Sequence, residues 1–290
     1  MFTTLITPEQ LQQLQASAIP LAVFDCTFDL MNPAAGAQQF AQCHVAGARH
    51  ADLDHHLSHH PQTASADDRP ASAGRHPLPS RSTFAAWLGS QGVGNGTQVV
   101  VYDRNGMNYC GRLWWMLKWC GHEAVAVLDG GLAAWQAAQG AVESGNSPAA
   151  EPARFELGEP LATLTDTATV LAGLGQASQT VLDARGAPRY RGEVEPLDPI
   201  AGHIPGALNR PFSDNLGPDG RFKPAAQLQA EFSALLAGRN PASVVHQCGS
   251  GVSAVPNLLA MELAGLGRQA LYAGSWSEWS RTPGLPVEKG

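Results

Sequence analysis

Residues 244–254 read Val-Val-His-Gln-Cys-Gly-Ser-Gly-Val-Ser-Ala. The apolar pair Val244-Val245 predicts a buried strand, and the apolar pattern from Val255 to Ala264 predicts a helix. Cys248 therefore lies in a short loop that joins a strand to a helix and contains two glycines. Glycines let such a loop curl until successive N–H groups point inward, and the helix N-terminus adds partial positive charge there. The pattern predicts an anion-binding loop that carries a thiol.

A cysteine in this loop is expected to be largely thiolate, the form that attacks electrophiles. The residues expected to cradle a negatively charged sulfur are those that follow it in the loop: Gly249, Gly251, Val252 and Ser253. Cysteine-dependent phosphatases clamp their phosphate with an arginine at the position occupied here by Ala254. Phosphate chemistry is therefore disfavoured.

The chain repeats itself. Residues 23–26, Val-Phe-Asp-Cys, correspond to residues 181–184, Val-Leu-Asp-Ala, and the pattern His-x-x-Gly-Ala occurs at both 44–48 and 203–207. In each half, short apolar runs alternate with helical patterns, as in the strand predicted at 99–102 and the helix predicted at 110–119. Alternating strands and helices are typical of parallel sheets covered by helices. We therefore expect an α/β fold built from two similar domains.

The boundary between the domains is expected near residue 150. Residues 141–160 are rich in Ala, Gly, Pro, Ser and Glu, as is typical of a linker. This divides the chain into domains at 1–145 and 160–290. The polar stretch 55–80 makes the first half longer and is expected to be a surface loop.

Composition narrows the class of protein. The net charge of −7 over 290 residues argues against a nucleic-acid partner. No apolar run approaches the roughly 18 residues that suggest a membrane span. The five cysteines include no Cys-x-x-Cys pair, which favours free thiols in a reducing cytoplasm. We expect no cofactor and no metal, because the one metal candidate is a group of loop histidines without a cysteine or carboxylate partner: His55, His56, His59 and His60.

The loop Cys-Gly-Ser-Gly-Val-Ser at 248–253 resembles that of the tandem rhodanese-type sulfurtransferases, in the form found in 3-mercaptopyruvate sulfurtransferases. Further matches lie at 183–185 (Asp-Ala-Arg), 202–207 (Gly-His-Ile-Pro-Gly-Ala) and 274–279 (Gly-Ser-Trp-Ser-Glu-Trp), so the resemblance covers nearly the whole chain. It implies two rhodanese-like domains, of which only the C-terminal one is catalytic. The first half agrees, since it has Asp103-Arg104 where Cys248 is expected.

The resemblance also implies a reaction. Cys248 would take the sulfane sulfur from a small-molecule donor and pass it, as a persulfide, to a thiol or to cyanide. Thiosulfate-preferring members carry basic residues where this chain has Gly249 and Ser250, which favours 3-mercaptopyruvate as the donor. A thiosulfate:cyanide sulfurtransferase, and a non-catalytic sulfur-relay or regulatory protein, remain the alternatives.

Site residues follow from the resemblance. Arg189 is expected to bind the donor carboxylate. Arg185 comes directly after the predicted strand 181–183, and this place favours a pairing with a carboxylate of the protein. Ser250, His76 and Asp54 are expected to form a Ser–His–Asp arrangement beside the cysteine. Mercaptopyruvate enzymes often have a second arginine where this chain has Asp198, and Arg191 or Arg210 are candidates to replace it. Because two domains can form a cleft within one chain, a monomer is expected.

Overall fold

A computed structural model describes residues 1–60, 69–146 and 149–290. The chain divides into two compact units. Unit 1 comprises residues 1–71, 79–161 and 218–221, and unit 2 comprises residues 72–78, 162–217 and 222–290. Each unit thus includes a short segment from the other half of the sequence. The expected surface loop 55–80 falls partly on residues 61–68, outside the described residues.

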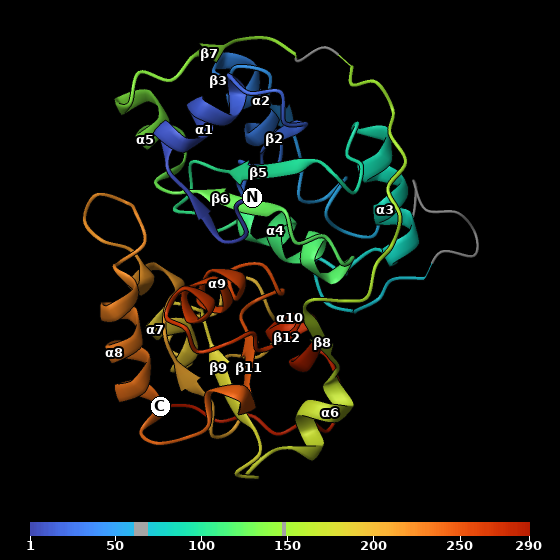
Figure 1. Cartoon of the computed structure of the whole chain (residues 1–290). Coiled ribbons are helices and arrows are strands. Elements are labelled where there is room, and N and C mark those ends of the chain that lie inside the picture. Colours follow the sequence, from blue (N-terminus) through green and yellow to red (C-terminus); the bar gives the residue numbers. More distant parts are fainter. Residues whose placement is uncertain (61–68, 147–148) are drawn as a thin grey trace. The chain divides into compact units, whose positions relative to one another are not determined.

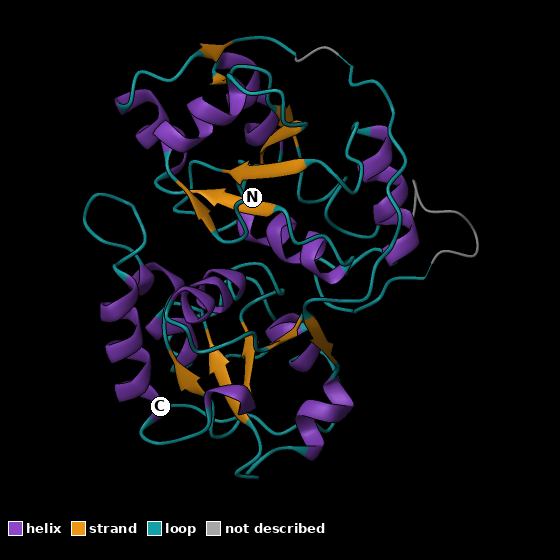
Figure 2. Ribbon diagram, viewed as in Figure 1, coloured by secondary structure: helices purple, strands orange, loops and turns teal. Residues whose placement is uncertain are grey.

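Unit 1 contains a parallel sheet flanked by helices (Figures 1 and 2). Its elements, in chain order, are β1 (Leu5–Ile6), α1 (Pro8–Gln15), β2 (Leu21–Asp25), α2 (Ala34–Gln42), β3 (His44–Val45), β4 (Arg49–His50), α3 (Arg81–Ser90), β5 (Gln98–Tyr102), α4 (Cys110–Trp119), β6 (Val125–Leu128), α5 (Gly131–Ala137) and β7 (Val142–Glu143). The sheet has the strand order β1-β6-β5-β2-β4, and β3 pairs separately with β7 in antiparallel fashion.

Unit 2 repeats this plan. Its elements are β8 (Thr163–Thr165), α6 (Thr167–Ala172), β9 (Thr180–Asp183), α7 (Ala187–Tyr190), β10 (Leu208–Asn209), the 3₁₀ helix η1 (Phe212–Asn215), α8 (Ala225–Leu236), η2 (Pro241–Ser243), β11 (Val244–Gln247), α9 (Val255–Leu263), β12 (Ala270–Tyr272) and α10 (Ser275–Trp279). The parallel sheet has the order β8-β12-β11-β9-β10, so each strand has a counterpart at the same place in unit 1. The predicted α/β fold with helix-flanked parallel sheets is confirmed.

The register of the central strands confirms the sequence repeat. Tyr102 at the end of β5 lies opposite Asp25 of β2, and Gln247 at the end of β11 lies opposite Asp183 of β9. Asp103 and Cys248 therefore occupy the same position, immediately after the central strand of their sheets. In an open parallel sheet, this edge is where ligands bind.

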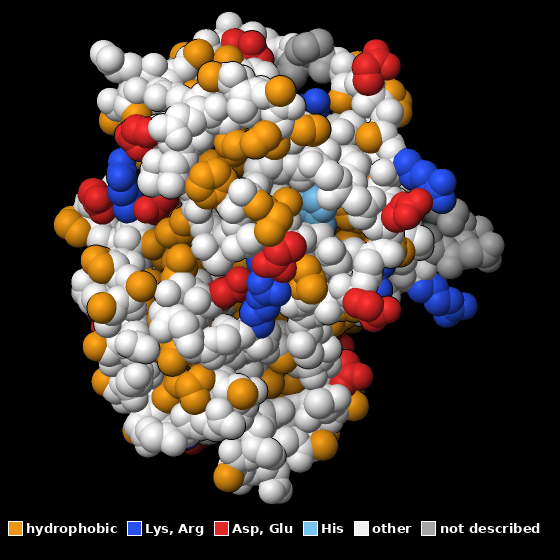
Figure 3. Space-filling model, viewed as in Figure 1, with side chains coloured by type: hydrophobic (Ala, Val, Ile, Leu, Met, Phe, Trp, Pro, Cys, Tyr) orange, Lys and Arg blue, Asp and Glu red, His pale blue; other side chains and the backbone are white. Residues whose placement is uncertain are grey.

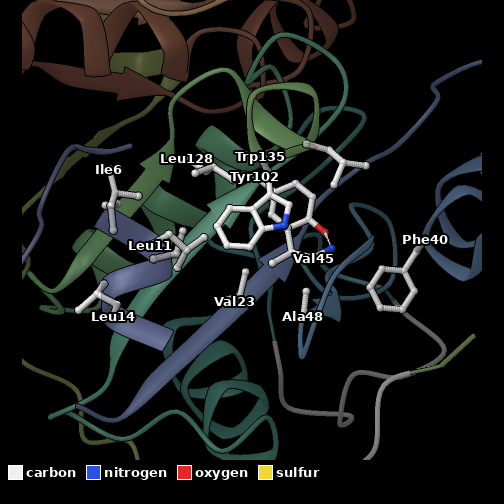
Figure 4. Packing of buried hydrophobic residues seen from close by; sticks show 13 residues of the cluster. Ile6, Leu11, Leu14, Val23, Phe40, Val45, Ala48, Tyr102, Leu128 and Trp135 are labelled. Carbon is white, nitrogen blue, oxygen red and sulfur yellow. Dashed lines mark hydrogen bonds between the residues drawn. The ribbon is translucent and has the colours of Figure 1, made fainter. Parts of the chain in front are cut away.

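Apolar side chains from strands and helices fill the space beside the sheet of unit 1 (Figure 4). Leu11 and Leu14 of α1 face Val23 of β2 and the ring of Trp135. The Tyr102 hydroxyl lies in this cluster and accepts a hydrogen bond from the Val45 N–H, 3.0 Å away. Burial raises the pKa of Tyr102 well above its usual range. The hydroxyl thus remains neutral while it fixes the end of β3.

The described residues of the expected linker 141–160 belong to unit 1, and backbone hydrogen bonds fix residues 153 and 158 to it. The Ala153 N–H donates to the Gly89 carbonyl over 2.9 Å, and the Gly158 N–H donates to the Cys120 carbonyl over 3.0 Å. Gly121 and Gly158 also pack closely, because a Cβ on Gly121 would lie 2.6 Å from the Gly158 Cα.

In the described part of the chain, no helix is long and apolar enough to cross a membrane. On the face drawn in Figure 3, acidic and basic side chains lie singly or in small mixed groups.

The central strand of unit 2 generates a prediction about acid stability. His246 of β11 is fully buried, and neither ring nitrogen has a hydrogen-bond partner among the described residues. Burial lowers its pKa to about 3. The unfolded chain takes up a proton near its ordinary value of about 6.5, so stability is retained above that pH and lost as the pH falls from there towards 3.

We expect the free energy of unfolding of the wild type to fall by about 2 kcal/mol more than that of His246→Leu between pH 7 and pH 5. Urea denaturation at the two pH values measures this difference. Parallel pH profiles for the two proteins would show that His246 is not the group responsible.

Candidate active site

Cys248 follows β11 directly and is 2% exposed. The first turn of α10 holds the backbone of the loop that starts there. The Cys248 N–H donates to the Ser275 hydroxyl over 3.1 Å, and the Trp276 N–H donates to the Cys248 carbonyl over 3.0 Å. The Ser277 N–H donates in turn to the Gly249 carbonyl over 2.8 Å. The thiol is thus carried by a loop whose beginning is fixed by three successive residues of α10.

The loop passes so close to the strand beside it that only glycine fits at position 251. Gly251 has φ +72°, and a Cβ there would lie 2.4 Å from the Ala273 carbonyl oxygen. The loop of unit 1 has the same length between its strand and its helix, and it carries Gly106, with φ +70°, at the corresponding position. The two loops therefore turn back at equivalent points.

The loop of unit 1 shows what such a turn can bind. The Asp103 carboxylate accepts hydrogen bonds of 2.8–2.9 Å from four backbone N–H groups, those of Asn105, Met107, Tyr109 and Cys110. Burial raises the pKa of Asp103, and the four N–H groups act in the opposite direction. This loop thus binds an anion, and the anion is its own side chain.

In unit 2, the corresponding position carries a thiol in place of the carboxylate. Within the described residues, the N–H groups of Ser250, Val252 and Ala254 donate no hydrogen bond. The predicted candidates Gly249, Val252 and Ser253 lie in this loop, next to the thiol in sequence. The loop therefore has N–H groups available for a negatively charged sulfur or ligand.

Ser250 and His76 come together. The His76 Nδ1 and the Ser250 Oγ are 2.7 Å apart, although the two residues are 174 positions apart in the sequence. His76 is 5% exposed and belongs to the segment 72–78, which is part of unit 2. Asp54 belongs to unit 1, where its N–H donates to the Asp52 carboxylate and burial raises its pKa. Two residues of the expected Ser–His–Asp arrangement, Ser250 and His76, thus lie in the same unit and contact each other.

Arg189 lies beside the loop. A Cβ on Gly249 would be 3.5 Å from the Arg189 Nη1. The other side of its guanidinium binds Glu195, with Nη2 2.6 Å from Oε1. The expected position of Arg189 near the thiol loop therefore agrees with the geometry of unit 2.

Arg185 has the internal role that the sequence indicated. Arg185 is buried and donates to both carboxylate oxygens of Asp183 and to the Gly202 carbonyl, and its guanidinium carbon lies 4.7 Å from the ring centroid of Trp276. Its donors are thus used within the protein, where it links the end of β9 to the segment that follows.

Arg191 and Arg210 are the two candidates for the second arginine. Among the described residues, neither makes a contact with the thiol loop. Arg191 is exposed and pairs with Glu193, with Nε 2.6 Å from Oε1. Arg210 donates to the Asn215 side chain and to Glu231, which are parts of η1 and α8. The arginine beside Gly249, apart from Arg189, is Arg75: its Nη2 would lie 3.2 Å from a Cβ on that glycine.

Sequence reasoning missed Arg75. The resemblance points to the imidazole of its neighbour His76, but nothing in the pattern around residue 75 indicates that this arginine lies near a loop so far along the chain. Such a contact depends on tertiary structure that motif spacing does not encode.

The histidine group contains no assembled metal site in the residues that the structure covers. No cluster of three or more His, Cys, Asp or Glu side chains there could hold a metal ion. His56 stacks on Trp87 with ring centroids 5.4 Å apart, and its Nδ1 accepts the Asp52 N–H. The ring centroids of His55 and His60 are 5.2 Å apart. His56 thus helps to order the segment after β4.

Comparison with known proteins agrees with this geometry. A family model described as "Rhodanese-like domain" matches residues 7–138 and 166–282. A Pseudomonas aeruginosa protein, provisionally named as a 3-mercaptopyruvate sulfurtransferase, is 48% identical over 99% of this chain and 98% of its own length. A Mycobacterium tuberculosis protein, provisionally named as the thiosulfate sulfurtransferase SseB, is 36% identical over 99% of this chain and 97% of its own. The solved structure of the Leishmania major 3-mercaptopyruvate sulfurtransferase matches with a TM-score of 0.78 and 30% identity, covering 98% of this chain and 76% of that one.

The close approach at Gly251 generates a stability prediction. Gly206 has the same φ of +72°, but a Cβ there would meet no atom within 4 Å. Gly206→Ala therefore introduces backbone strain alone, and we expect it to lower the free energy of unfolding by about 1 kcal/mol. Gly251→Ala adds a clash with the Ala273 backbone, and we expect a loss of at least about 3 kcal/mol. Equal losses in urea denaturation would contradict a tightly packed loop.

Proposed function

Since the chain belongs to the rhodanese family, as a tandem-domain sulfurtransferase, we propose that it moves a sulfur atom from 3-mercaptopyruvate to a thiol or cyanide through a persulfide on Cys248. The observation that carries the proposal is the equivalence of Cys248 and Asp103. In unit 1 this loop position holds a carboxylate within four N–H groups, so in unit 2 the same turn suits a thiolate or a persulfide anion. The catalytic domain is then the one predicted at 160–290, and the domain at 1–145 is non-catalytic.

In the first step, the Cys248 thiolate attacks the sulfur of 3-mercaptopyruvate. A sulfur–sulfur bond forms, the carbon–sulfur bond of the donor breaks, and its electron pair goes to the methylene carbon as the enolate of pyruvate. The proton of the donor thiol ends on that carbon, which gives pyruvate, and Cys248 carries the persulfide.

Ser250 and His76 provide the path for this proton. The hydroxyl and the imidazole are 2.7 Å apart, within hydrogen-bond reach, so each can pass a proton to the other. Asp54 stays the third residue that the sequence predicts for a Ser–His–Asp arrangement. Arg189 would hold the carboxylate of the donor beside Gly249 during the transfer.

In the second step, the acceptor attacks the outer sulfur of the persulfide. The sulfur–sulfur bond breaks, and the Cys248 thiolate is regenerated as thiocyanate or a new persulfide leaves. Because pyruvate departs before the acceptor reacts, ping-pong kinetics are expected. All five cysteines are free thiols, which suits a reducing cytoplasm and a reaction that begins from a thiolate.

The donor is proposed from the loop residues. The loop lacks the basic residues that thiosulfate-preferring members carry at the positions of Gly249 and Ser250, and the planar guanidinium of Arg189 beside Gly249 matches the geometry of a carboxylate. Thiosulfate is the second candidate, favoured by the name of the Mycobacterium tuberculosis relative.

The first experiment measures kcat/KM for 3-mercaptopyruvate and for thiosulfate, with cyanide and a small thiol as acceptors. We expect 3-mercaptopyruvate to give the larger value. A larger value for thiosulfate would overturn the proposed donor, and no turnover with either would favour the relay protein.

Cys248→Ser is expected to lower kcat by more than about 1,000-fold, because the nucleophile is lost. The matched control is Cys43→Ser, which removes a half-buried thiol of unit 1. Mass spectrometry after incubation with donor alone should show one added sulfur atom on the wild type and on Cys43→Ser, and none on Cys248→Ser. Added sulfur on Cys248→Ser would place the persulfide elsewhere.

A further inference from the structure

A cavity of about 340 Å³ lies in unit 1 beside β4, the edge strand of its sheet. Residues of α2, β4 and the end of α3 line it, among them Phe40, Arg49, His50 and Gln91. All four belong to unit 1, whereas the thiol loop belongs to unit 2. We propose that this cavity binds an organic monocarboxylate through the Arg49 guanidinium, as a ligand site that the sulfur transfer does not use.

Arg49 is a cation without a counter-charge. Its guanidinium makes no hydrogen bond or ion pair with any residue that the structure describes, and its Nη1 is buried. Burial lowers the pKa of Arg49, and no nearby carboxylate acts in the opposite direction. Taking a charge out of water is costly unless an opposite charge and hydrogen bonds compensate it. An anion in the cavity would supply both.

The second copy of the fold shows that the strand does not need this arginine. Arg49 lies opposite Phe24 of β2, and Leu208 lies opposite Leu182 of β9. Because Phe24 and Leu182 correspond in the sequence repeat, Arg49 occupies the position of a leucine. The same strand therefore forms in unit 2 with a hydrocarbon side chain, and the charge in unit 1 serves another purpose.

The next residue of the strand, by contrast, has the same role in both units. The His50 Nε2 lies 3.2 Å from the Thr27 carbonyl oxygen, and the Asn209 side chain donates to the Arg185 carbonyl over 2.9 Å. Thr27 and Arg185 are equivalent positions, each two residues after the end of the neighbouring strand. Residue 50 thus fixes a loop, whereas Arg49 departs from its counterpart and faces no described partner.

The composition of the cavity favours a carboxylate with an organic body. Among the described lining residues, Arg49 is the one Lys or Arg side chain, so it can neutralise a single negative charge but not a phosphate dianion. Its parallel N–H groups match the two oxygens of a carboxylate. Phe40 and alanines of the lining offer apolar surface to the rest of the ligand. The volume lies within the range of about 300–1,000 Å³ that is typical of small-molecule sites.

The test compares Arg49→Leu, which copies the residue of unit 2, with Arg154→Leu as the matched control. Arg154 also belongs to unit 1, but its side chain is 87% exposed and pairs with Glu156. Isothermal titration uses benzoate as the probe and benzamide as its uncharged counterpart. We expect Arg49→Leu to raise the dissociation constant for benzoate at least about 10-fold, and Arg154→Leu to change it less than about 2-fold.

A third variant separates this cavity from the donor site. Arg189→Gln removes the guanidinium that lies beside Gly249 in unit 2. Since Arg189 does not line the cavity, this variant should bind benzoate with unchanged affinity. The result does not depend on whether the protein transfers sulfur from 3-mercaptopyruvate.

Urea denaturation provides a second readout. Because Arg49 is desolvated without a counter-charge, Arg49→Leu is expected to raise the urea midpoint of the free protein. Benzoate should raise the midpoint of the wild type but not that of Arg49→Leu, since a ligand stabilises only the folded state that binds it.

The outcomes are distinct. Loss of benzoate binding in Arg49→Leu alone would support the site. Equal affinity in the wild type and Arg49→Leu, or a loss in Arg189→Gln instead, would overturn it. Equal binding of benzamide and benzoate, tighter binding of inorganic phosphate than of benzoate, or no benzoate binding by the wild type would do the same.

Discussion

The backbone turn after each central strand is the constraint on which the rest of the site depends. A left-handed glycine, Gly106 in one unit and Gly251 in the other, brings the chain back over the strand end. In unit 2 the turn lies against the backbone of Ala273, so it cannot open to accept a larger residue. N–H groups that would point to water in an ordinary loop face inward, and an anion must satisfy them. The chemistry of each loop therefore depends on which anion accepts hydrogen bonds from these N–H groups.

The two units use the same turn in different ways. In unit 1, Asp103 closes it from within, and Arg104 pairs with the Asp25 carboxylate 2.8 Å away. In unit 2, a thiol takes that position and the polar partners come from outside the loop, from α10, from Arg189 and from the segment 72–78. The loop of unit 1 satisfies its own N–H groups, whereas the loop of unit 2 has donors available for a ligand. Such unsatisfied donors cost stability, which is typical of functional sites.

Much of this could be predicted from sequence where the signal was local. The helix predicted at 110–119 is α4 residue for residue, and the helix predicted from 255 differs from α9 by one residue at its end. The internal pairing of Arg185 followed from its place directly after a strand. Two-residue strands such as β3 and β4 carry no periodic pattern, so sequence did not indicate them. The position of Arg75 and the packing of residues 153–158 depend on contacts between distant segments, which propensity and motif spacing do not record.

The segment 72–78 also has a consequence for how the site comes into existence during synthesis. His76 and Ser250, which lie 2.7 Å apart, leave the ribosome 174 residues apart. The segment can therefore take its place in unit 2 only after the last strands of that unit have been made. A gene fragment that encoded residues 160–290 alone would supply the thiol and its loop but neither His76 nor Arg75. The fold consists of two similar parts, but neither half of the sequence contains all the residues of the site. Division of the gene between the halves would separate Cys248 from His76 and Arg75.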